Sequence, residues 1–235
     1  MSCILLTGGF GYIGSHTANV LSNANEDFII VDNFSNCKKD VITKLEKTIN
    51  KKEKFYELDI RDDIKLARII NENKVNGVIH FAALKSVFDS IINPLEYYDV
   101  NVNGTINILR SMRLTGVKKF IFSSTAAIYG EPQYCPIDEN HNLEALNPYG
   151  RTKIIIENIL KDIVKIEKDW SVACLRYFNP IGAHSSGLIG DDPISDKTNN
   201  LVPAIIKVIN GYKKYLEIYG DDYETADGTG VRDFI

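Results

Sequence analysis

Tyr149 and Lys153 stand four residues apart, at the point where a helix is predicted to begin. Residues with this spacing share one face of a helix, so the lysine ammonium is expected close to the tyrosine phenol. A nearby cation favours the phenolate and lowers the pKa of a tyrosine, which can then take a proton from a substrate hydroxyl. Because Tyr and Lys are common residues, the spacing indicates a catalytic pair only together with other motifs.

A glycine-rich loop lies upstream of this pair. Gly8, Gly11 and Gly14 follow an apolar run and open a segment with helical periodicity. Such glycines permit a tight turn and a close approach of the backbone to a pyrophosphate, which the helix N-terminus then binds. Asp32 ends the next apolar run, where a carboxylate bonds the adenosine ribose hydroxyls and disfavours a 2′-phosphate. The motif predicts binding of NAD rather than NADP, and a simple glycine turn is the alternative.

Apolar runs alternate with helical periodicity through most of the chain. Strands are expected over residues 3–7, 28–32, 54–58, 77–82, 119–124 and 171–177. Helices are expected over residues 13–23, 41–50, 63–73, 94–114 (as one helix or two), 148–167 and 201–211. This alternation predicts an α/β fold, a doubly wound parallel Rossmann sheet with helices on both faces. Residues 1–179 are predicted to form this domain, and residues 180–235 an incomplete, smaller second lobe.

The composition excludes several other classes of protein. The 235 residues carry a net charge of −4 without a basic patch, so no nucleic-acid partner is expected. No apolar stretch approaches the roughly 20 residues that span a bilayer, and the first residues lack the pattern of a secretory leader. The four cysteines and four histidines show no metal-ligand spacing, so we expect no metal site and a reducing, cytoplasmic setting.

The motifs together resemble the extended short-chain dehydrogenase/reductase family. They are the glycine loop, Ser124-Thr125 after the fifth predicted strand, and Tyr149-xxx-Lys153. Longer strings resemble the branch of that family that epimerises UDP-glucose at C4; they cover residues 7–16, 31–33, 80–85, 94–98, 101–105, 175–180 and 228–233. The resemblance implies NAD-dependent interconversion of UDP-glucose and UDP-galactose by a homodimer.

The resemblance also implies roles for individual residues. Tyr149 would be the base, Lys153 would bond the nicotinamide ribose, and Thr125 would bridge the substrate hydroxyl and Tyr149. Residues expected to contact the cofactor are Gly8, Gly11, Tyr12, Ile13, Gly14, Asp32, Asn33, Asp59, Ile60, Phe81, Ala82, Lys85, Asn101, Tyr149, Lys153 and Tyr177. Residues expected to hold the UDP-sugar are Lys85, Thr125, Phe178, Asn179, Asn200, Leu201 and Arg232.

Simpler structural roles stay open for several of these residues. On pattern alone Phe81 is a core residue, and Lys85 is a solvated loop cation. Asn179, before Pro180, has the pattern of a turn initiator. Asp59 is equally suited to cap the helix that follows it.

The residues after Thr125 and the end of the chain narrow the function further. Nucleotide-sugar 4,6-dehydratases of this family carry an Asp-Glu pair after that threonine, whereas this chain has Ala126-Ala127, so dehydration is disfavoured. A decarboxylase or C5-type epimerase fits the short motifs but not the longer strings. The chain ends at Ile235, inside a family motif, so we expect C-terminal truncation, with an inactive NAD-binding module as the alternative.

Overall fold

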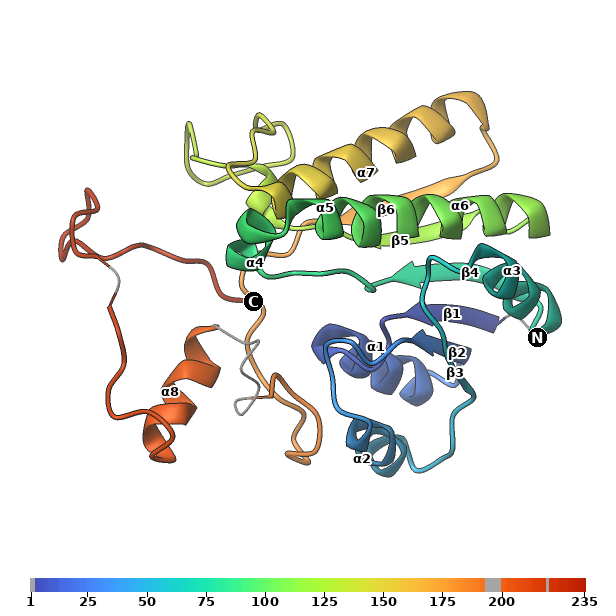
Figure 1. The fold of residues 1–235 in the computed structure, drawn as a ribbon, viewed down its shortest axis with the longest axis horizontal. Helices are drawn as coiled ribbons and strands as arrows, with labels where there is room; N and C mark the ends of the chain where they lie inside the picture. The colour runs from blue at the N-terminus through green and yellow to red at the C-terminus, as the bar shows by residue number, and fades with distance from the viewer. Residues whose placement is uncertain (1–2, 193–199, 219) are drawn as a thin grey trace.

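A six-stranded sheet runs through the computed structural model, which describes residues 3–192, 200–218 and 220–235 (Figure 1). Its strands are β1 (Cys3–Thr7), β2 (Asp27–Asp32), β3 (Phe55–Glu57), β4 (Val75–His80), β5 (Lys119–Ser123) and β6 (Ser171–Leu175). All neighbouring pairs are parallel, in the order β3-β2-β1-β4-β5-β6. The order reverses between β1 and β4, and doubly wound sheets bind nucleotides at such a switch point. The predicted fold class is confirmed.

Most helices also lie where the sequence predicts them. They are α1 (Tyr12–Asn23), α2 (Asp40–Ile49), α3 (Asp63–Glu72), α7 (Pro148–Ile166) and α8 (Leu201–Ile209). The helix expected over residues 94–114 consists of α5 (Pro94–Tyr97), a π-helical turn η1 (Tyr98–Asn103) and α6 (Gly104–Thr115). Two short elements were not predicted, α4 (Val87–Ile92) and the 3₁₀ turn η2 (Ala126–Ile128). Both are too short to show a helical period in the sequence.

Helices cover both faces of the sheet and enclose two cores. Successive strand residues point to opposite faces, so Leu5 and Leu6 of β1 enter different cores, and both are fully buried. Leu5 packs in the larger core with α3, α6 and α7, and Leu6 packs in the smaller one with α1 and α2 (Figure 1). The strands at the sheet edges, β3 and β6, each have a partner on one side only and keep exposed residues.

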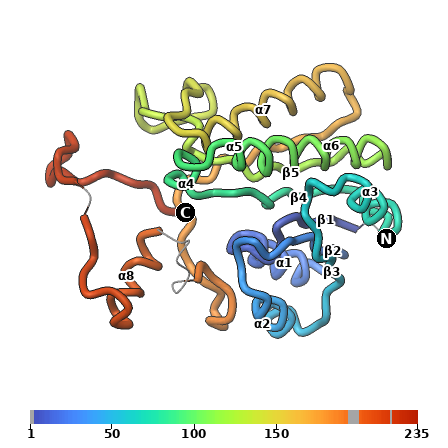
Figure 2. The backbone as a smooth tube through the Cα atoms, viewed as in Figure 1, coloured from blue at the N-terminus to red at the C-terminus, as the bar shows by residue number. Residues whose placement is uncertain are grey.

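The chain beyond β6 packs more loosely. The end of the chain returns to the segment after β6, as the tube in Figure 2 shows, and Phe234 forms a parallel bridge with Asn179. Asn179 N–H donates to Asp233 O at 3.1 Å, and Ile235 N–H donates to Asn179 O at 3.1 Å. Ile189 is 3% exposed and belongs to the smaller core. In the ranges that the structure describes, no helix has the length and apolar character needed to cross a membrane.

Candidate active site

The glycine loop joins β1 to α1 at the switch point of the sheet. Gly8 has φ +68°, and a Cβ there would lie 2.6 Å from the backbone nitrogen of Ala82. A Cβ on Gly14 would lie 2.3 Å from Gly8 O, so both positions require glycine. Gly11 caps α1 without a side-chain hydrogen bond, and the first turn of α1 holds no acidic residue. The free N–H groups of that turn, which includes Tyr12 and Ile13, therefore fit an anion such as a pyrophosphate.

Asp32 ends β2 beside this loop. Its carboxylate accepts hydrogen bonds from the backbone N–H of Phe10 at 3.0 Å and of Phe34 at 2.9 Å. Burial raises the pKa of Asp32, and the bonds from Phe34, Phe10 and Asn33 oppose that rise. The carboxylate thus lies at the carboxyl edge of the sheet and is fixed in position before any ligand binds, as a ribose acceptor requires.

The end of β4 closes the other side of the loop. The backbone N–H groups of Phe81 and Ala82 donate to Thr7 O at 2.9 and 3.0 Å. Phe81 packs against the smaller core and Ala82 against the larger one. The core role that the pattern left open for Phe81 is therefore present, while its backbone borders the glycine loop. Asn101, in η1, holds Leu84 through N–H···Oδ1 and Nδ2–H···O bonds of 2.8 and 3.1 Å.

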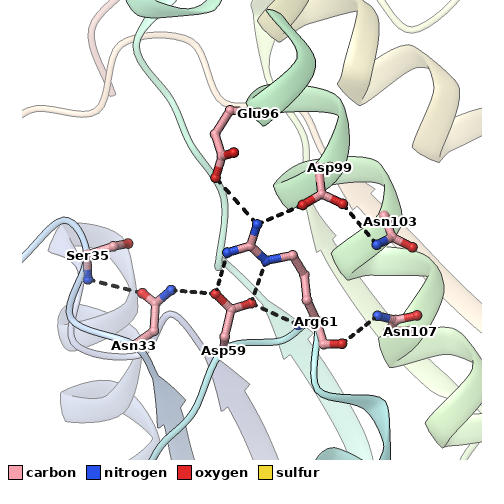
Figure 3. A network of polar contacts seen from close by, with 8 residues as sticks. All are labelled: Asn33, Ser35, Asp59, Arg61, Glu96, Asp99, Asn103 and Asn107. Atoms are coloured by element: carbon pink, nitrogen blue, oxygen red, sulfur yellow. Dashed lines mark hydrogen bonds and ion pairs between the residues drawn. The ribbon is translucent and has the colours of Figure 1, made fainter. Parts of the chain in front are cut away.

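Asp59 lies after β3 in the polar network of Figure 3. Its two oxygens accept from Arg61 Nε at 3.0 Å and Nη2 at 2.8 Å, and Asn33 donates to it at 3.2 Å. The Arg61 side-chain hydrogen bond is the main cause that lowers the pKa of Asp59 to about 2. Asp59 does not cap α3, since Asp62 accepts from the N–H of Lys65 there. Ile60, 5% exposed, belongs to the larger core.

Arg61 connects this network to the helices opposite. Its Nη1 lies 2.7 Å from Asp99 of η1 and 3.4 Å from Glu96 of α5, as Figure 3 shows. Asn107 of α6 donates to Arg61 O at 3.0 Å. The network therefore ties the segment after β3 to η1, the turn that also carries Asn101.

The structure brings the three predicted catalytic residues together. Asn147 caps α7 by accepting from the N–H of Gly150 at 2.8 Å, which places Tyr149 in the first turn and Lys153 one turn later. Thr125 is the N-cap of η2, and its hydroxyl lies close enough to the Tyr149 hydroxyl to favour the phenolate and lower the pKa of Tyr149. Lys153 Nζ lies 5.8 Å from the centroid of the Tyr149 ring. A phenol, a hydroxyl and an amine thus converge after the carboxyl end of β5, where a substrate alcohol can lose a proton.

The expected effect of Lys153 on Tyr149 is wrong. Burial raises the pKa of Tyr149, and the Thr125 hydrogen bond, rather than Lys153, opposes that rise. Lys153 Nζ donates to Ser123 O at 2.9 Å and lies over the tyrosine ring instead of at its hydroxyl. Burial also lowers the pKa of Lys153 to about 7, which weakens it as a source of positive charge.

A buried ion pair behind these residues was not predicted. Glu157, 1% exposed, accepts from Arg176 Nη2 at 2.7 Å and Nε at 3.2 Å, and from Ser124 Oγ at 2.6 Å. Ser124 precedes Thr125, Glu157 follows Lys153 by one helical turn, and Arg176 precedes Tyr177. The pair thus joins three segments that carry predicted site residues. The spacing of Glu157 from Lys153 was the available signal, because it places both on one face of α7.

Residues 177–179 follow the carboxyl end of β6. Tyr177 is half-buried, its burial raises the pKa of its phenol, and its carbonyl accepts from the N–H of Ala126 at 2.8 Å. The Phe178 ring stacks on Tyr129 with centroids 6.5 Å apart. Asn179 Nδ2 donates to Asp233 O at 3.0 Å, so this residue pairs with the chain end rather than starting an isolated turn.

The remaining predicted substrate residues are more dispersed. Asn200 Nδ2 donates to Asp191 at 2.6 Å, and Leu201, the first residue of α8, is 46% exposed. Lys85 Nζ lies 3.9 Å from the other oxygen of Asp191, so Lys85 is not a simple solvated cation. Arg232 bonds Val231 O and lies over a tyrosine ring, and no hydrogen bond joins it to Asn179 or Asn200 among the described residues.

Known proteins resemble this chain along its whole length. Residues 4–235 match the NAD dependent epimerase/dehydratase family. UDP-glucose 4-epimerases from Pasteurella multocida and Bacillus subtilis are 48% and 46% identical, each over 99% of this chain and 69% and 68% of their own length.

Solved structures agree with these relatives. The UDP-glucose 4-epimerase of Stenotrophomonas maltophila, with bound NAD and formylated UDP-arabinopyranose, superposes with a TM-score of 0.96 at 42% identity. The enzyme from Bifidobacterium longum, in complex with NAD⁺ and UDP, gives 0.95 at 44% identity. Both comparisons cover 100% of this chain and 70% of the other. The chain belongs to the NAD dependent epimerase/dehydratase family.

Proposed function

We propose that the chain is an NAD-dependent UDP-glucose 4-epimerase that interconverts UDP-glucose and UDP-galactose. The observation that carries this proposal is the convergence of the Thr125 hydroxyl, the Tyr149 phenol and the Lys153 amine after the carboxyl end of β5. These residues follow β5, whereas the glycine loop and Asp32 follow β1 and β2, on the other side of the switch point between β1 and β4. No carboxylate follows Thr125, which favours epimerisation over loss of water.

Each catalytic residue has a role that its environment supports. Tyr149 takes the proton of the sugar C4 hydroxyl, and the Thr125 hydroxyl stabilises the phenolate by hydrogen bonding. When bound, NAD supplies a positively charged nicotinamide that accepts the C4 hydride and returns it to the other face of the 4-keto sugar. Lys153, held at Ser123 O, bonds the nicotinamide ribose. Burial raises the pKa of Tyr149, and the positive charge of an oxidised nicotinamide near the phenol would lower it.

The two regions of the chain bind different molecules in this proposal. Residues 1–179 bind NAD through the glycine loop, Asp32 with Asn33, Asp59 and Ile60, and the β4 end with Asn101. Residues 180–235 contribute to binding of the UDP part of the substrate, where Arg232 suits a diphosphate because its guanidinium is a bidentate donor. Phe178, Asn179, Asn200 and Leu201 complete this set.

The chain forms a homodimer in the cytoplasm in this proposal. Large apolar side chains stay exposed on α5, α6 and α7, among them Leu95 at 83%, Leu114 at 81% and Ile166 at 80%. Pairing two copies would bury them. The four cysteines all carry free thiols, which is typical of a reducing compartment.

The test is conversion of UDP-galactose to UDP-glucose by the purified chain with NAD, followed by chromatography. Tyr149→Phe is expected to lower kcat by about 10²–10⁴-fold, the usual contribution of a general base. Tyr134→Phe is the matched control, because Tyr134 is exposed and bonds only Asp138. NAD binding without conversion by the wild-type chain, or equal rates for Tyr149→Phe and wild type, would contradict the proposal.

A further inference from the structure

A chain of buried hydrogen bonds runs from the glycine loop to the catalytic helix. Thr7, the residue before Gly8, bonds His80 Nδ1 through its hydroxyl at 2.7 Å. His80 Nε2 bonds the Thr105 hydroxyl at 2.9 Å, and Thr105 Oγ1 donates to Asn101 O at 2.6 Å. These four side chains are at most 2% exposed. None of these hydrogen bonds joins neighbours on one strand, so together they connect β1, β4, α6 and η1.

The series of hydrogen bonds continues to Tyr149. Asn101 Nδ2 donates to the Thr152 hydroxyl at 3.1 Å, and Thr152 Oγ1 donates to Tyr149 O at 2.6 Å. Thr152 is fully buried. Because Asn101 also holds Leu84 through two bonds, the same chain fixes the loop after β4. Displacement of His80 would therefore be felt at Gly8 and at the start of α7.

The protons in this chain can be assigned from its ends. Asn101 O is a carbonyl and only accepts, so the single hydroxyl proton of Thr105 is committed to it. Thr105 Oγ1 must then accept from His80, which places a proton on Nε2. In the neutral ring Nδ1 has no proton, so it accepts from the Thr7 hydroxyl. Every donor and acceptor is satisfied in this one arrangement.

The surroundings of His80 keep the ring neutral. It packs beside Phe120 and Phe122 of the neighbouring strand β5, with its ring centroid 5.9 Å from each of theirs. Lys153 Nζ lies over the Phe122 ring, 4.8 Å from its centroid. Burial, and then the charge of Lys153, lower the pKa of His80 to about 3. A second proton would also leave two donors facing one another at Nδ1 and Thr7 unless the threonine turned.

We propose that His80 is a positioning residue, a neutral imidazole with its proton on Nε2 that locks the glycine loop to the helix carrying Tyr149 and Lys153. It touches no reacting atom in this arrangement. It sets the distance between the pyrophosphate end of the cofactor site and the base, so it serves binding and turnover together. The inference rests on the proposed function only for the role of Tyr149; the lock itself rests on the bonds described.

The first test is NMR of the wild-type chain with ¹⁵N-labelled histidine. A long-range ¹H–¹⁵N spectrum is expected to show one ring with a protonated Nε2 and a bare Nδ1, unchanged between pH 5 and 8. His80→Gln identifies which signals belong to that ring. A proton on Nδ1, or titration of His80 near its ordinary value of 6.5, would overturn the proposal even if every variant failed to fold.

The second test measures NAD affinity and turnover in hydroxyl variants. Thr105→Val removes the hydroxyl at nearly constant volume, and Thr105→Ser restores it. Loss of one buried hydrogen bond changes a binding constant by about tenfold. Thr105→Val should therefore weaken NAD binding about tenfold and lower kcat. The KM for the UDP-sugar should stay nearly unchanged. Thr105→Ser should recover both. Equal NAD affinity and equal kcat in Thr105→Val and Thr105→Ser would overturn the proposed lock.

A matched control separates this effect from loss of any buried histidine. His141 is 3% exposed and bonds Gln133 N–H at 2.9 Å, in the loop between β5 and α7. His141→Gln should leave NAD affinity unchanged, whereas His80→Gln should weaken it. Failure of the proposed function would appear differently, as wild-type chain that binds NAD and shows the Nε2–H ring but does not convert UDP-galactose.

Discussion

The sheet region and the region after β6 differ in how completely they bury their apolar side chains. Among the described residues the buried apolar side chains lie between Leu5 and Trp170, with Ile189 and Pro203 as the exceptions. Helix α8 is strongly apolar, yet Ile209 is 75% exposed, and the helix stands apart from the sheet in Figure 1. Because burial of apolar surface is the dominant favourable term in folding, the sheet region is held by its own cores. The region after β6 depends on a few links.

A matched pair of isoleucines gives the largest test of this difference. Ile30 of β2 is fully buried in the smaller core, and Ile→Ala at such a position costs about 2–5 kcal/mol. Ile209→Ala at the exposed end of α8 should change the free energy of unfolding by less than about 0.5 kcal/mol. Urea unfolding followed by far-UV circular dichroism measures both. Comparable losses in the two variants would show that α8 contributes to a common core.

Charged pairs offer a second contrast. Glu157 and Arg176 form a buried pair, whereas Lys213 and Glu217 form an exposed one with side chains 51% and 49% accessible. Removing one partner of a buried pair typically costs about 3–5 kcal/mol, and Glu157→Gln, which keeps the shape and some bonding, should fall at or below the lower end. Lys213→Gln should have no measurable effect on the urea midpoint. A loss from Lys213→Gln equal to that from Glu157→Gln would contradict this contrast.

The buried pair also predicts how stability depends on pH. Burial would raise the pKa of Glu157, but the bonds from Arg176 and Ser124 outweigh it and hold the pKa below the ordinary 4.5. A lowered folded-state pKa contributes stability above pH 4.5 and loses it as the pH falls through the folded value. The stability difference between wild type and Glu157→Gln should therefore shrink from pH 6 to pH 3. A difference that is constant over this range would rule out the carboxylate as its source.

The sequence predicted what depends on local chemistry. The positive φ of Gly8 and the close approach of Gly14 to Gly8 O follow from the glycine spacing, and the strands follow from continuous apolar runs. The meeting of Thr125, Tyr149 and Lys153 was also expected, because strand ends in a parallel sheet share one edge.

What the sequence did not predict depends on long-range contacts. The Glu157–Arg176 pair joins residues 19 positions apart, and neither partner has a distinctive spacing with the other. The direction of the Tyr149 pKa shift depends on burial, which the i, i+4 spacing with Lys153 does not contain. The π-helical turn at Asn101 and the hydrogen bonds of His80 to Thr7 and Thr105 likewise depend on elements far away in the chain.

The smallest prediction concerns the link between the two regions. Tyr12 of α1 donates its hydroxyl proton to Gly182 O at 2.8 Å, across 170 positions of the chain. Tyr12→Phe removes only this bond, which is worth about 0.5–1.5 kcal/mol. If the two regions unfold separately, the lost bond makes local opening near residue 182 easier and leaves the global urea midpoint unchanged. Local opening has its own free energy, which is separate from that of global unfolding.

Limited proteolysis should then cut near residue 182 several-fold faster than in wild type. Tyr215→Phe, at a residue 65% exposed, should leave the rate of cutting unchanged. A fall in the global midpoint with no change in the rate of cutting would mean that the two regions unfold as one unit, despite their unequal burial.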